Sequence, residues 1–480
     1  MAVADRWSDI QALHLPGMSF DPTTGVASFE YELRGAARSL RFTERVTLPV
    51  PSQPDPGGLD VIRRVLDLLY VAAATSYYKV AAAPRVELGA IRLAEGAMAW
   101  VNALFRQGLG EFAYRNDLPH VLDLEILGEP GVAAGDVTDR LVGGRAPIVC
   151  VGGGKDSIVS IEALKAADLR PAVFAVNPNP IIRAVMEVSG QPVVAARRKL
   201  DPGLFAINAE GAYNGHIPVT AINSLIAVAS AVLGGYGPVV MSNERSASVP
   251  NLSWHGRDIN HQWSKGLEAE ILLRDALAAH AGLTNAYFSL LRGMSELHIA
   301  SLFARIEAYD AVVTSCNAAF KINDASSRWC GDCDKCRFVF LALAPFTARK
   351  RLVGIFAKDM LEDTTQLPGY QELCGLTAHK PFECVGETDE CLVALRLLTE
   401  DPEWSDAAVV RLLRSAVPAG DWPSEAVRAS VLRGDAPNVV PPTYRLALAA
   451  LNEPALNEPA LNEPALDEPA LDHPDGLVLD

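Results

Sequence analysis

The stretch 147-PIVCVGGGKDSIVSIEALK-165 joins a short apolar run, three glycines and a pattern of helical spacing. A strand, a glycine-rich turn and a helix N-terminus together form an anion site, because the first backbone N–H groups of a helix have no partner inside it. A turn needed only for strand–helix packing is the alternative, but packing does not explain Lys155 and Asp156 at the helix start. We therefore predict that six residues bind phosphate: Gly152, Gly153, Gly154, Lys155, Asp156 and Ser157.

The order of these residues distinguishes between the known phosphate loops. A Walker A loop would need glycine at Val149 and Ser or Thr at Asp156, and a dinucleotide fingerprint would need glycine at Ser157. The segment GGKDS instead resembles the pyrophosphate loop (PP-loop) of the N-type ATP pyrophosphatases, S-G-G-x-D-S, with Gly152 in place of the leading serine. The resemblance implies cleavage of ATP between its α- and β-phosphates, with Asp156 helping to place Mg²⁺. The segment 215-GHIPVTAINSL-225 resembles a second motif of these enzymes.

Strand-like and helical patterns alternate from about residue 146 onward. Alternation of this kind predicts an α/β fold with a doubly wound, mostly parallel sheet and a ligand site beyond the carboxyl ends of its strands. The PP-loop resemblance implies an adenine nucleotide alpha hydrolase-like core. The expected strands are 147–151, 171–177, 192–198, 237–244 and 311–316, and the expected helices are 156–167 and 219–233.

The rest of the chain divides into regions that differ in sequence pattern and composition. An α+β N-terminal domain is expected to contain a hairpin (26–35 with 41–50) and helices over 59–80 and 95–115. Proline every five residues in the Leu-Asn-Glu-Pro-Ala repeats forbids a continuous α-helix near the C-terminus. We predict four regions: the N-terminal domain 1–145, a PP-loop core 146–350, a helical C-terminal region 351–448 and a disordered acidic tail 449–480.

The composition narrows the class of protein. The formal net charge is −16, which disfavours broad binding to nucleic acid through a basic surface. The sequence has no run of about 18 apolar residues that would span a membrane, and the segment 222–237 reads as a buried helix. Its N-terminus also lacks the pattern of a secretory signal. We therefore expect a cytoplasmic enzyme, with its oligomeric state left open.

Three cysteines form a C-x-x-C-x-x-C motif within 329-WCGDCDKCRF-338, and a fourth cysteine precedes them. Four thiolates satisfy tetrahedral Zn²⁺, with an iron–sulfur cluster as the alternative. The predicted ligands of a structural zinc ion are Cys316, Cys330, Cys333 and Cys336. The other four cysteines have no such spacing and are expected to be buried thiols: Cys150, Cys374, Cys384 and Cys391.

A polar segment, residues 242–270, follows the expected strand 237–244 and should lie over the carboxyl edge of the sheet. A solvated loop is the alternative for its charges. His261 and Lys265 are the candidate acid–base pair, because residues four apart share one face if the segment is helical. Asp258 is a further catalytic candidate, and both Asp258 and His255 are reserves for this pair. The expected substrate-binding residues are Arg245, His255, Arg257 and Asn260.

In combination, GGGKDS, SNERSAS…NHQWSK and WCGDCDKCRF resemble the ATP-dependent UDP-N-acetylmuramoyl-L-alanyl-L-glutamate epimerases of bacterial peptidoglycan synthesis, over about residues 10–440. The resemblance implies inversion of the terminal L-Glu of UDP-MurNAc-L-Ala-L-Glu to D-Glu, with ATP converted to AMP and pyrophosphate. Adenylation removes the charge of a carboxylate and thereby makes its α-hydrogen acidic. The first and third motifs alone also fit the shorter 7-cyano-7-deazaguanine synthases, so another carboxylate-adenylating enzyme is the alternative. A non-catalytic zinc protein on a nucleotide fold is a third.

Overall fold

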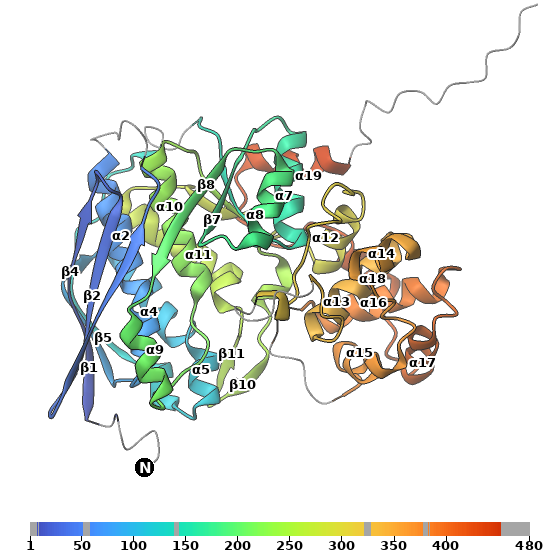
Figure 1. Ribbon diagram of the computed structural model, residues 1–480, viewed down its shortest axis with the longest axis horizontal. Helices are drawn as coiled ribbons and strands as arrows, with labels where there is room; N and C mark the ends of the chain where they lie inside the picture. The colour runs from blue at the N-terminus through green and yellow to red at the C-terminus, as the bar shows by residue number, and fades with distance from the viewer. Residues whose placement is uncertain are drawn as a thin grey trace, which may run out of the picture.

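The computed structural model describes residues 7, 9–50, 58–138, 144–320, 328–377, 383 and 385–452. One ten-stranded sheet runs through much of the molecule, in the order β12-β9-β6-β7-β8-β3-β2-β1-β4-β5 (Figure 1). Its strands are β1 Ile10–Asp21, β2 Val26–Gly35, β3 Ser39–Thr47, β4 Arg85–Leu93, β5 Glu125–Pro130, β6 Ile148–Cys150, β7 Ala172–Val176, β8 Val193–Lys199, β9 Val239–Met241 and β12 Tyr287–Ser289. A separate hairpin consists of β10 Leu252–Trp254 and β11 Arg257–Ile259.

The strands β12, β9, β6, β7 and β8 are mutually parallel; β12, β9, β6 and β7 are largely buried, whereas alternate residues of β8 are exposed. Alternate side chains of a strand point to opposite faces. Ile148 and Phe174 accordingly join one apolar core, which also contains residues of α10 Val219–Gly234. Val149 and Val173 join a second core with residues of α7 Lys155–Ala166. Helices therefore cover both faces, and the predicted mixed α/β fold with a mostly parallel sheet is confirmed.

The other half of the sheet comes from the N-terminal part of the chain. β2 and β3 form the predicted antiparallel hairpin, and β3 pairs antiparallel with β8 across the predicted boundary at residue 145. A buried ion pair reinforces this junction, since Arg198 Nε lies 2.7 Å from Glu44 Oε1. The division into domains stays a prediction, but its first two regions share one hydrogen-bonded sheet.

One predicted strand is wrong. Residues 311–316 form no strand, and the fifth parallel strand is β12, which pairs with β9. The backbone N–H groups at 311–316 form hydrogen bonds with loop residues and not with a neighbouring strand. Thr314 N donates to Gly153 O, and Cys316 N donates to Thr314 Oγ1. Two predicted helices are also divided: residues 59–80 contain α2 and α3, and residues 95–115 contain α4 and α5.

The helices of the N-terminal and central parts are α2 Leu59–Ala73, α3 Thr75–Tyr78, α4 Glu95–Arg106, α5 Gly110–Arg115, α7, α8 Pro180–Ser189, α9 Pro202–Ala209, α10, α11 Leu267–Ala276 and α12 Glu296–Phe303. Those that follow are α13 Asp334–Leu343, α14 Arg349–Phe356, α15 Leu367–Leu373, α16 Thr388–Glu400, α17 Ala408–Ala416, α18 Glu425–Val431 and α19 Pro442–Asn452.

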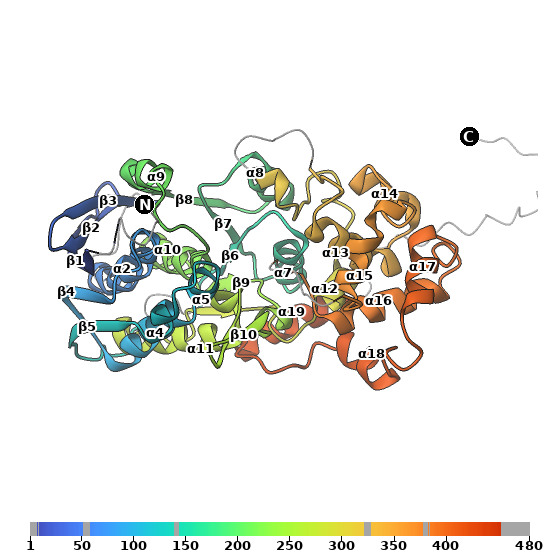
Figure 2. The ribbon, with the colours of Figure 1, turned by 90° about the horizontal axis from the view of Figure 1, so that it is seen from below.

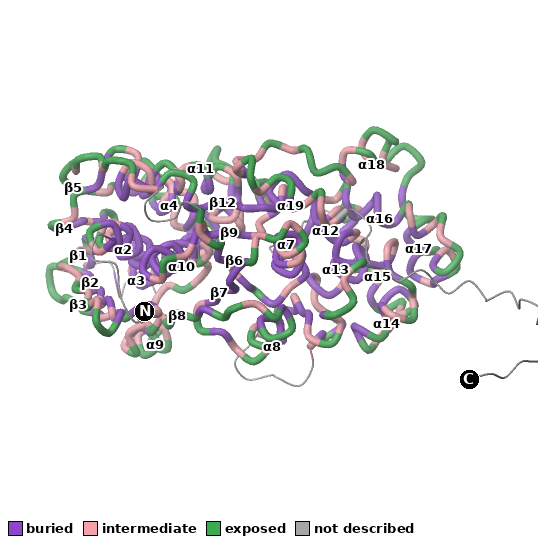
Figure 3. The backbone as a smooth tube through the Cα atoms, turned by 90° about the horizontal axis from the view of Figure 1, so that it is seen from above, coloured by how far each residue is buried: buried purple, intermediate pink, exposed green. Residues whose placement is uncertain are grey.

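The C-terminal helices α14 to α18 lie at the end of the molecule opposite β1 to β5 (Figure 2). The last helix, α19, returns to pack against α7 (Figure 1). Buried residues are concentrated in β6, β7, β9 and α10, in the middle of the molecule (Figure 3). Within the described parts of the chain, no helix is long and apolar enough to cross a membrane. Most of the predicted tail, residues 453–480, lies outside the described residues.

Candidate active site

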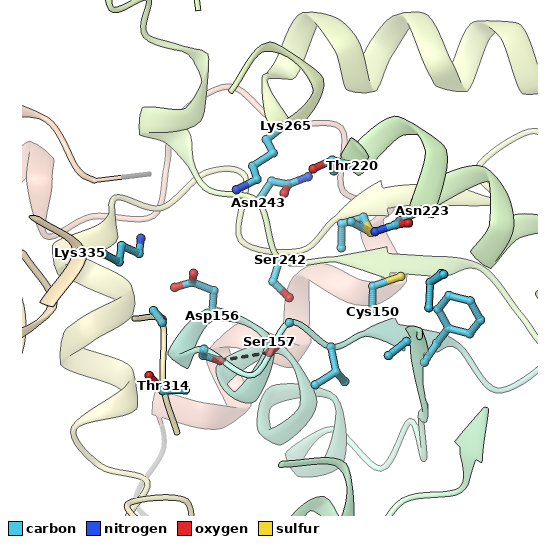
Figure 4. A pocket seen from close by; sticks show the side chains of 18 of the residues that line it. Cys150, Asp156, Ser157, Thr220, Asn223, Ser242, Asn243, Lys265, Thr314 and Lys335 are labelled. Atoms are coloured by element: carbon cyan, nitrogen blue, oxygen red, sulfur yellow. Dashed lines mark hydrogen bonds between the residues drawn. The ribbon is translucent and has the colours of Figure 1, made fainter. Parts of the chain in front are cut away.

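A cavity of about 350 Å³ lies beyond the carboxyl ends of β6, β7 and β9 (Figure 4). This is where the α/β pattern predicts a ligand. The glycine loop, the start of α10 and the segments around residues 242 and 315 all reach it. Its lining includes Cys150, Gly152, Gly154, Asp156, Ser157, Thr220, Asn223, Ser242, Asn243, Lys265, Ser315 and Lys335.

The glycine loop presents a helix N-terminus to the cavity. The helix α7 begins at Lys155, and its N-cap residue Gly154 has no side chain to satisfy the first backbone N–H groups. Gly153 has a φ of 88°, in the region that favours glycine, and its carbonyl accepts a 3.1 Å hydrogen bond from Thr314 N. A Cβ built at Gly152 would meet no heavy atom within 4 Å. The loop is therefore open on the side of the cavity and fixed on the side of the fold.

The side chain of Lys155 is buried and does not line the cavity. Its ammonium contacts Glu296 and lies 2.5 Å from Asp156 Oδ1, and its side chain is 2% exposed. Burial alone would raise the pKa of Glu296, but Lys155 and Lys335 lower it to about 2. Lys335 Nζ lies 3.6 Å from Glu296 Oε1 and itself lines the cavity. Lys155 is thus placed to anchor the loop, and Lys335 is a cation at the cavity that the sequence interpretation missed.

Asn243 and Lys265 reach the cavity from the side opposite Asp156 and Ser157 (Figure 4). Asn243 Nδ2 is buried and makes no hydrogen bond within the described part of the chain. A buried amide without a partner indicates a place where a ligand can accept a hydrogen bond. The start of α10 supplies Thr220 and Asn223 to the same cavity, which places the segment 215–225 beside the glycine loop, as its motif predicts.

The polar segment divides between several locations. His255, Arg257 and Asp258 are exposed on the β10–β11 hairpin, where Arg257 pairs with Asp123. Arg245 lies 3.7 Å from Glu387, next to the C-terminal helices.

Asn260 serves the backbone of its own loop, because Nδ2 donates to Ala247 O over 2.9 Å. Lys265 is the one predicted residue of this segment in the cavity lining, and the catalytic and substrate-binding roles of the others stay predictions.

His261 lies outside the cavity lining, in a group that the sequence interpretation did not foresee. Its Nδ1 contacts Glu111 of α5, and His216 lies beside it with 4.5 Å between ring centroids. The condition that would place His261 and Lys265 on one helical face is not met, because only Trp263–Lys265 form a short 3-10 helix. Glu111 carries no sequence signal, because its two histidine partners lie more than 100 residues away and its pair with Arg115 is an ordinary i,i+4 pair within α5.

The four predicted zinc ligands come together. The Sγ atoms of Cys316, Cys330, Cys333 and Cys336 all lie within 4.8 Å of one another. This spacing fits a tetrahedral Zn²⁺ site of four thiolates. The group joins the segment that carries Ser315 to α13, which carries Lys335, so it sits behind one wall of the cavity.

The remaining cysteines differ in position. Cys374 and Cys391 are buried, as predicted, whereas Cys384 lies outside the described residues. Cys150 is half-buried in the cavity wall, and burial raises the pKa of its thiol to about 12. It is therefore a neutral thiol at physiological pH.

These features define an α/β protein with a candidate phosphate site and a candidate metal site at the same edge of its sheet. Residues 4–290 match the family described as MurL N-terminal domain, and residues 312–428 match the MurL C-terminal domain. The chain therefore belongs to the family of UDP-N-acetyl-alpha-D-muramoyl-L-alanyl-L-glutamate epimerases, and the predicted resemblance is confirmed. No solved structure gave a significant match.

Three relatives carry that epimerase name. The chain is 58% identical to the protein of Micromonospora sp., covering 92% of this chain and 98% of the relative. It is 57% identical to the protein of Salinispora tropica, covering 93% and 97%. It is 41% identical to the protein of Xanthomonas oryzae pv. oryzae, covering 84% and 89%.

Proposed function

We propose that this protein inverts the terminal L-Glu of UDP-MurNAc-L-Ala-L-Glu to D-Glu through a carboxyl adenylate, with ATP converted to AMP and pyrophosphate, in peptidoglycan synthesis. The names of its relatives support the substrate and the inversion. The observation that carries the ATP part is the uncapped N-terminus of α7, which faces a cavity at the carboxyl edge of the sheet.

The residues around the cavity suit a PP-loop ATP site. The first N–H groups of α7 and the Ser157 hydroxyl would hold the departing pyrophosphate, because a helix N-terminus favours negative charge. Lys335 and Lys265 add positive charge at the same cavity. Asp156 is the carboxylate placed to hold Mg²⁺, which would neutralise part of the phosphate charge when bound.

The substrate carboxylate must be activated before its α-hydrogen can leave. Removal of that hydrogen from a free carboxylate would create a second negative charge on the same group, whereas the acyl adenylate yields a singly charged enolate. Asn243 Nδ2 is a donor without a partner near Lys265, and it suits a developing negative oxygen. His261 and Lys265 remain our candidates for proton removal and return.

The cysteine group would hold a structural zinc ion. Its four sulfur atoms would bind the metal, and the metal would fix the segment with Ser315 and the start of α13 as one wall of the cavity. In this proposal the metal takes no part in proton transfer.

One assay tests the function. The protein is incubated with Mg-ATP and UDP-MurNAc-L-Ala-L-Glu, and AMP, pyrophosphate and the chirality of the glutamate are followed. We expect all three products, and Asp156→Asn should slow AMP formation about 100-fold. Asp60→Asn, at the exposed start of α2, serves as the control. Release of AMP without D-Glu would favour another carboxylate-adenylating enzyme, and loss of all three signals from folded protein would refute the proposal.

A further inference from the structure

Three segments that are distant in sequence place a carboxylate between two imidazoles. Glu111 is in α5, His216 precedes α10 and His261 follows β11. Glu111 Oε2 contacts Nδ1 of His261 and lies 3.8 Å from Nδ1 of His216. Both rings therefore turn the same nitrogen toward one oxygen atom, and Nε2 of each ring lies on the side away from the carboxylate.

The carboxylate in this group is held firmly. Glu111 is 5% exposed, and its second oxygen accepts a 2.6 Å hydrogen bond from Arg115 Nε. The loop of His216 is fixed to the same helix, because Asn116 Nδ2 donates to Asn214 O over 3.3 Å and a Cβ at Gly215 would lie 3.1 Å from the Phe112 ring.

The second histidine is held by its own loop. His261 N donates to Asn251 Oδ1 over 2.9 Å. An arrangement fixed by buried and backbone partners from three segments is a built site and not a chance contact of surface side chains.

The charges of the group are unequal. Burial would raise the pKa of Glu111, but the hydrogen bond and charge of His261, together with Arg115, bring it below its usual value. Burial, the neighbouring His261 and the charge of Lys265 lower the pKa of His216 to about 4. At neutral pH the group therefore contains a carboxylate and a neutral His216. His216 lies four residues before Thr220 and His261 four residues before Lys265, and Thr220 and Lys265 both line the cavity, so the group lies near it.

We propose that Glu111 and His216 belong to the proton-transfer machinery beside the nucleotide cavity, with Glu111 a positioning residue for His261 and His216 a proton carrier. This inference rests on the proposed function. Glu111 accepts from Nδ1–H and so directs the basic Nε2 of His261 at the substrate, as the carboxylate of a catalytic triad does for its histidine.

The proton balance closes over one turnover. The α-C–H bond of the activated glutamyl group breaks, its electron pair forms the enolate, and the proton goes to His261 Nε2. Lys265 then donates a proton to the other face of the carbon, which gives the inverted centre. His261 is left with one extra proton and Lys265 lacks one, and the neutral His216 carries that proton back toward Lys265.

The same three ligand atoms, all within 4.8 Å of one another, could in principle hold a divalent cation. Arg115, paired with Glu111, and the nearby Lys265 already supply positive charge there. The charges therefore favour a proton site over a metal site.

Glu111→Gln separates positioning from binding. The amide would donate to Nδ1 of His261 and thereby stabilise the wrong tautomer. We expect D-Glu formation and deuterium incorporation from D₂O at the α-carbon to fall about 100-fold or more, whereas the KM for ATP and the formation of AMP change less than about threefold. Asp67→Asn is the matched control. Asp67 Oδ2 lies 3.3 Å from Nε2 of His280, and this carboxylate–histidine pair lines a different cavity.

His216→Asn tests the carrier role. We expect the first turnover, measured by rapid quench, to keep its rate, and the steady-state rate to fall about tenfold. An equal fall of both rates would overturn the carrier role.

Three outcomes overturn the role of Glu111. Glu111→Gln could retain deuterium exchange, it could lose AMP formation together with exchange, or it could lose a divalent ion that the wild type binds in addition to the cysteine site. If the wild type itself makes AMP but no D-Glu, the proposed function fails first, and this inference fails with it.

Discussion

Gly152 stands where the PP-loop pattern has serine, and the structure shows what that difference leaves. A Cβ at this position would meet nothing within 4 Å, and the residue lines the cavity. The neighbouring Gly153, by contrast, has a φ of 88° that side chains rarely adopt. The two adjacent glycines thus have different roles: Gly152 leaves space in the cavity, and Gly153 permits a backbone conformation with positive φ.

Gly152→Ser and Gly153→Ala should therefore differ. The serine hydroxyl can donate to a phosphate, so we expect the KM for ATP to fall about fivefold, equivalent to about 1 kcal/mol. Alanine at Gly153 should strain the loop by about 1–2 kcal/mol and slow AMP formation at least about tenfold. Kinetics of AMP release at several ATP concentrations, with thermal unfolding as the control for folding, check both. A stable Gly152→Ser variant that no longer uses ATP would contradict the open space.

Glu390 is a buried acid near Glu296, the residue that contacts Lys155 of the glycine loop. Burial raises its pKa to about 8, and the charge of Glu296 contributes. Its Oε2 accepts a 2.8 Å hydrogen bond from Leu297 N. Because the folded pKa lies above the unfolded value, the stabilisation from the protonated group is complete below about pH 4.5 and is lost as the pH rises through 8.

Glu390→Gln should remove this pH dependence. The amide keeps an acceptor for Leu297 N and carries no charge, so the variant should lose about 2 kcal/mol less unfolding free energy than the wild type between pH 6 and 8. Urea unfolding at the two pH values measures this difference. Glu425→Gln, at the exposed start of α18, is the control. Parallel losses in wild type and variant would show that Glu390 is ionised at both pH values.

At the scale of elements, one buried ion pair positions the segment that carries Lys265. Arg292 and Glu270 are each 1% exposed and lie 2.8 Å apart. Arg292 also donates to Glu244 O over 2.6 Å and to Lys265 O over 2.5 Å, while Glu270 accepts from Ser289 N at the end of β12. Both ends of the polar segment are thereby tied to the edge of the sheet.

Arg292→Met should leave Glu270 buried without its partner and cost about 3–5 kcal/mol of unfolding free energy. Arg292→Lys keeps the charge but cannot reach three acceptors at once. We expect it to fold and to lower kcat for D-Glu formation about tenfold with little change in the KM for ATP. Urea unfolding and steady-state kinetics separate these effects. Unchanged kinetics in Arg292→Lys would show that the carbonyl of Lys265 needs no such support.

The cysteine group permits a prediction at the same scale. Cys333→Ser should lose the bound metal, lower the midpoint of thermal unfolding and raise the KM for ATP, because Ser315 and Lys335 would lose their shared anchor. Elemental analysis of the purified protein gives the metal content, and Cys374→Ser, a buried cysteine outside the group, is the control. A colourless wild type with one zinc per chain would exclude the iron–sulfur alternative.

Elements were predictable where a long pattern exists. The helices α7 and α10 and the hairpin of β2 and β3 follow from periodicity and glycine turns. The strand β12 has only three residues, Tyr287–Ser289, and gives no comparable signal. The apolar run 311–316 gives a stronger strand signal, but its backbone N–H groups donate hydrogen bonds within the loops around Gly153 and Cys316. The tertiary contacts thus overrode the local pattern, which favoured residues 311–316 over β12.

For the whole molecule, the continuous sheet explains why the candidate site was only partly predictable. The glycine loop and the cysteine group are local in sequence, and each could be found from spacing alone. The group of Glu111, His216 and His261 exists because the N-terminal and central parts of the chain fold as one layer. His216 and His261 each lie in a motif that the sequence shows, but neither motif indicates that the two residues meet, and Glu111 lies in no motif. Sequence reasoning therefore predicted the candidate phosphate and metal sites but not the carboxylate of Glu111 beside His261.

The helix α19 also links distant parts of the molecule. α19 packs against α7, the helix whose N-terminus forms the glycine loop. Ala447 is fully buried in this contact, and the ring of Tyr444 lies 4.8 Å from that of Phe288 in β12. A segment at the end of the chain thus covers the second apolar core beside the candidate active site.

Two truncations test this arrangement. A chain that ends at residue 452 loses only the repeat tail, which we predict to be disordered, so its thermal midpoint and its KM for ATP should match those of the full chain. A chain that ends at residue 441 also loses α19 and uncovers apolar side chains of α7, which should cost several kcal/mol of unfolding free energy. Because α7 carries the loop, we expect the shorter chain to raise the KM for ATP before it alters the proton-transfer steps. If both truncated chains retain the stability and KM of the full chain, α19 does not support the loop.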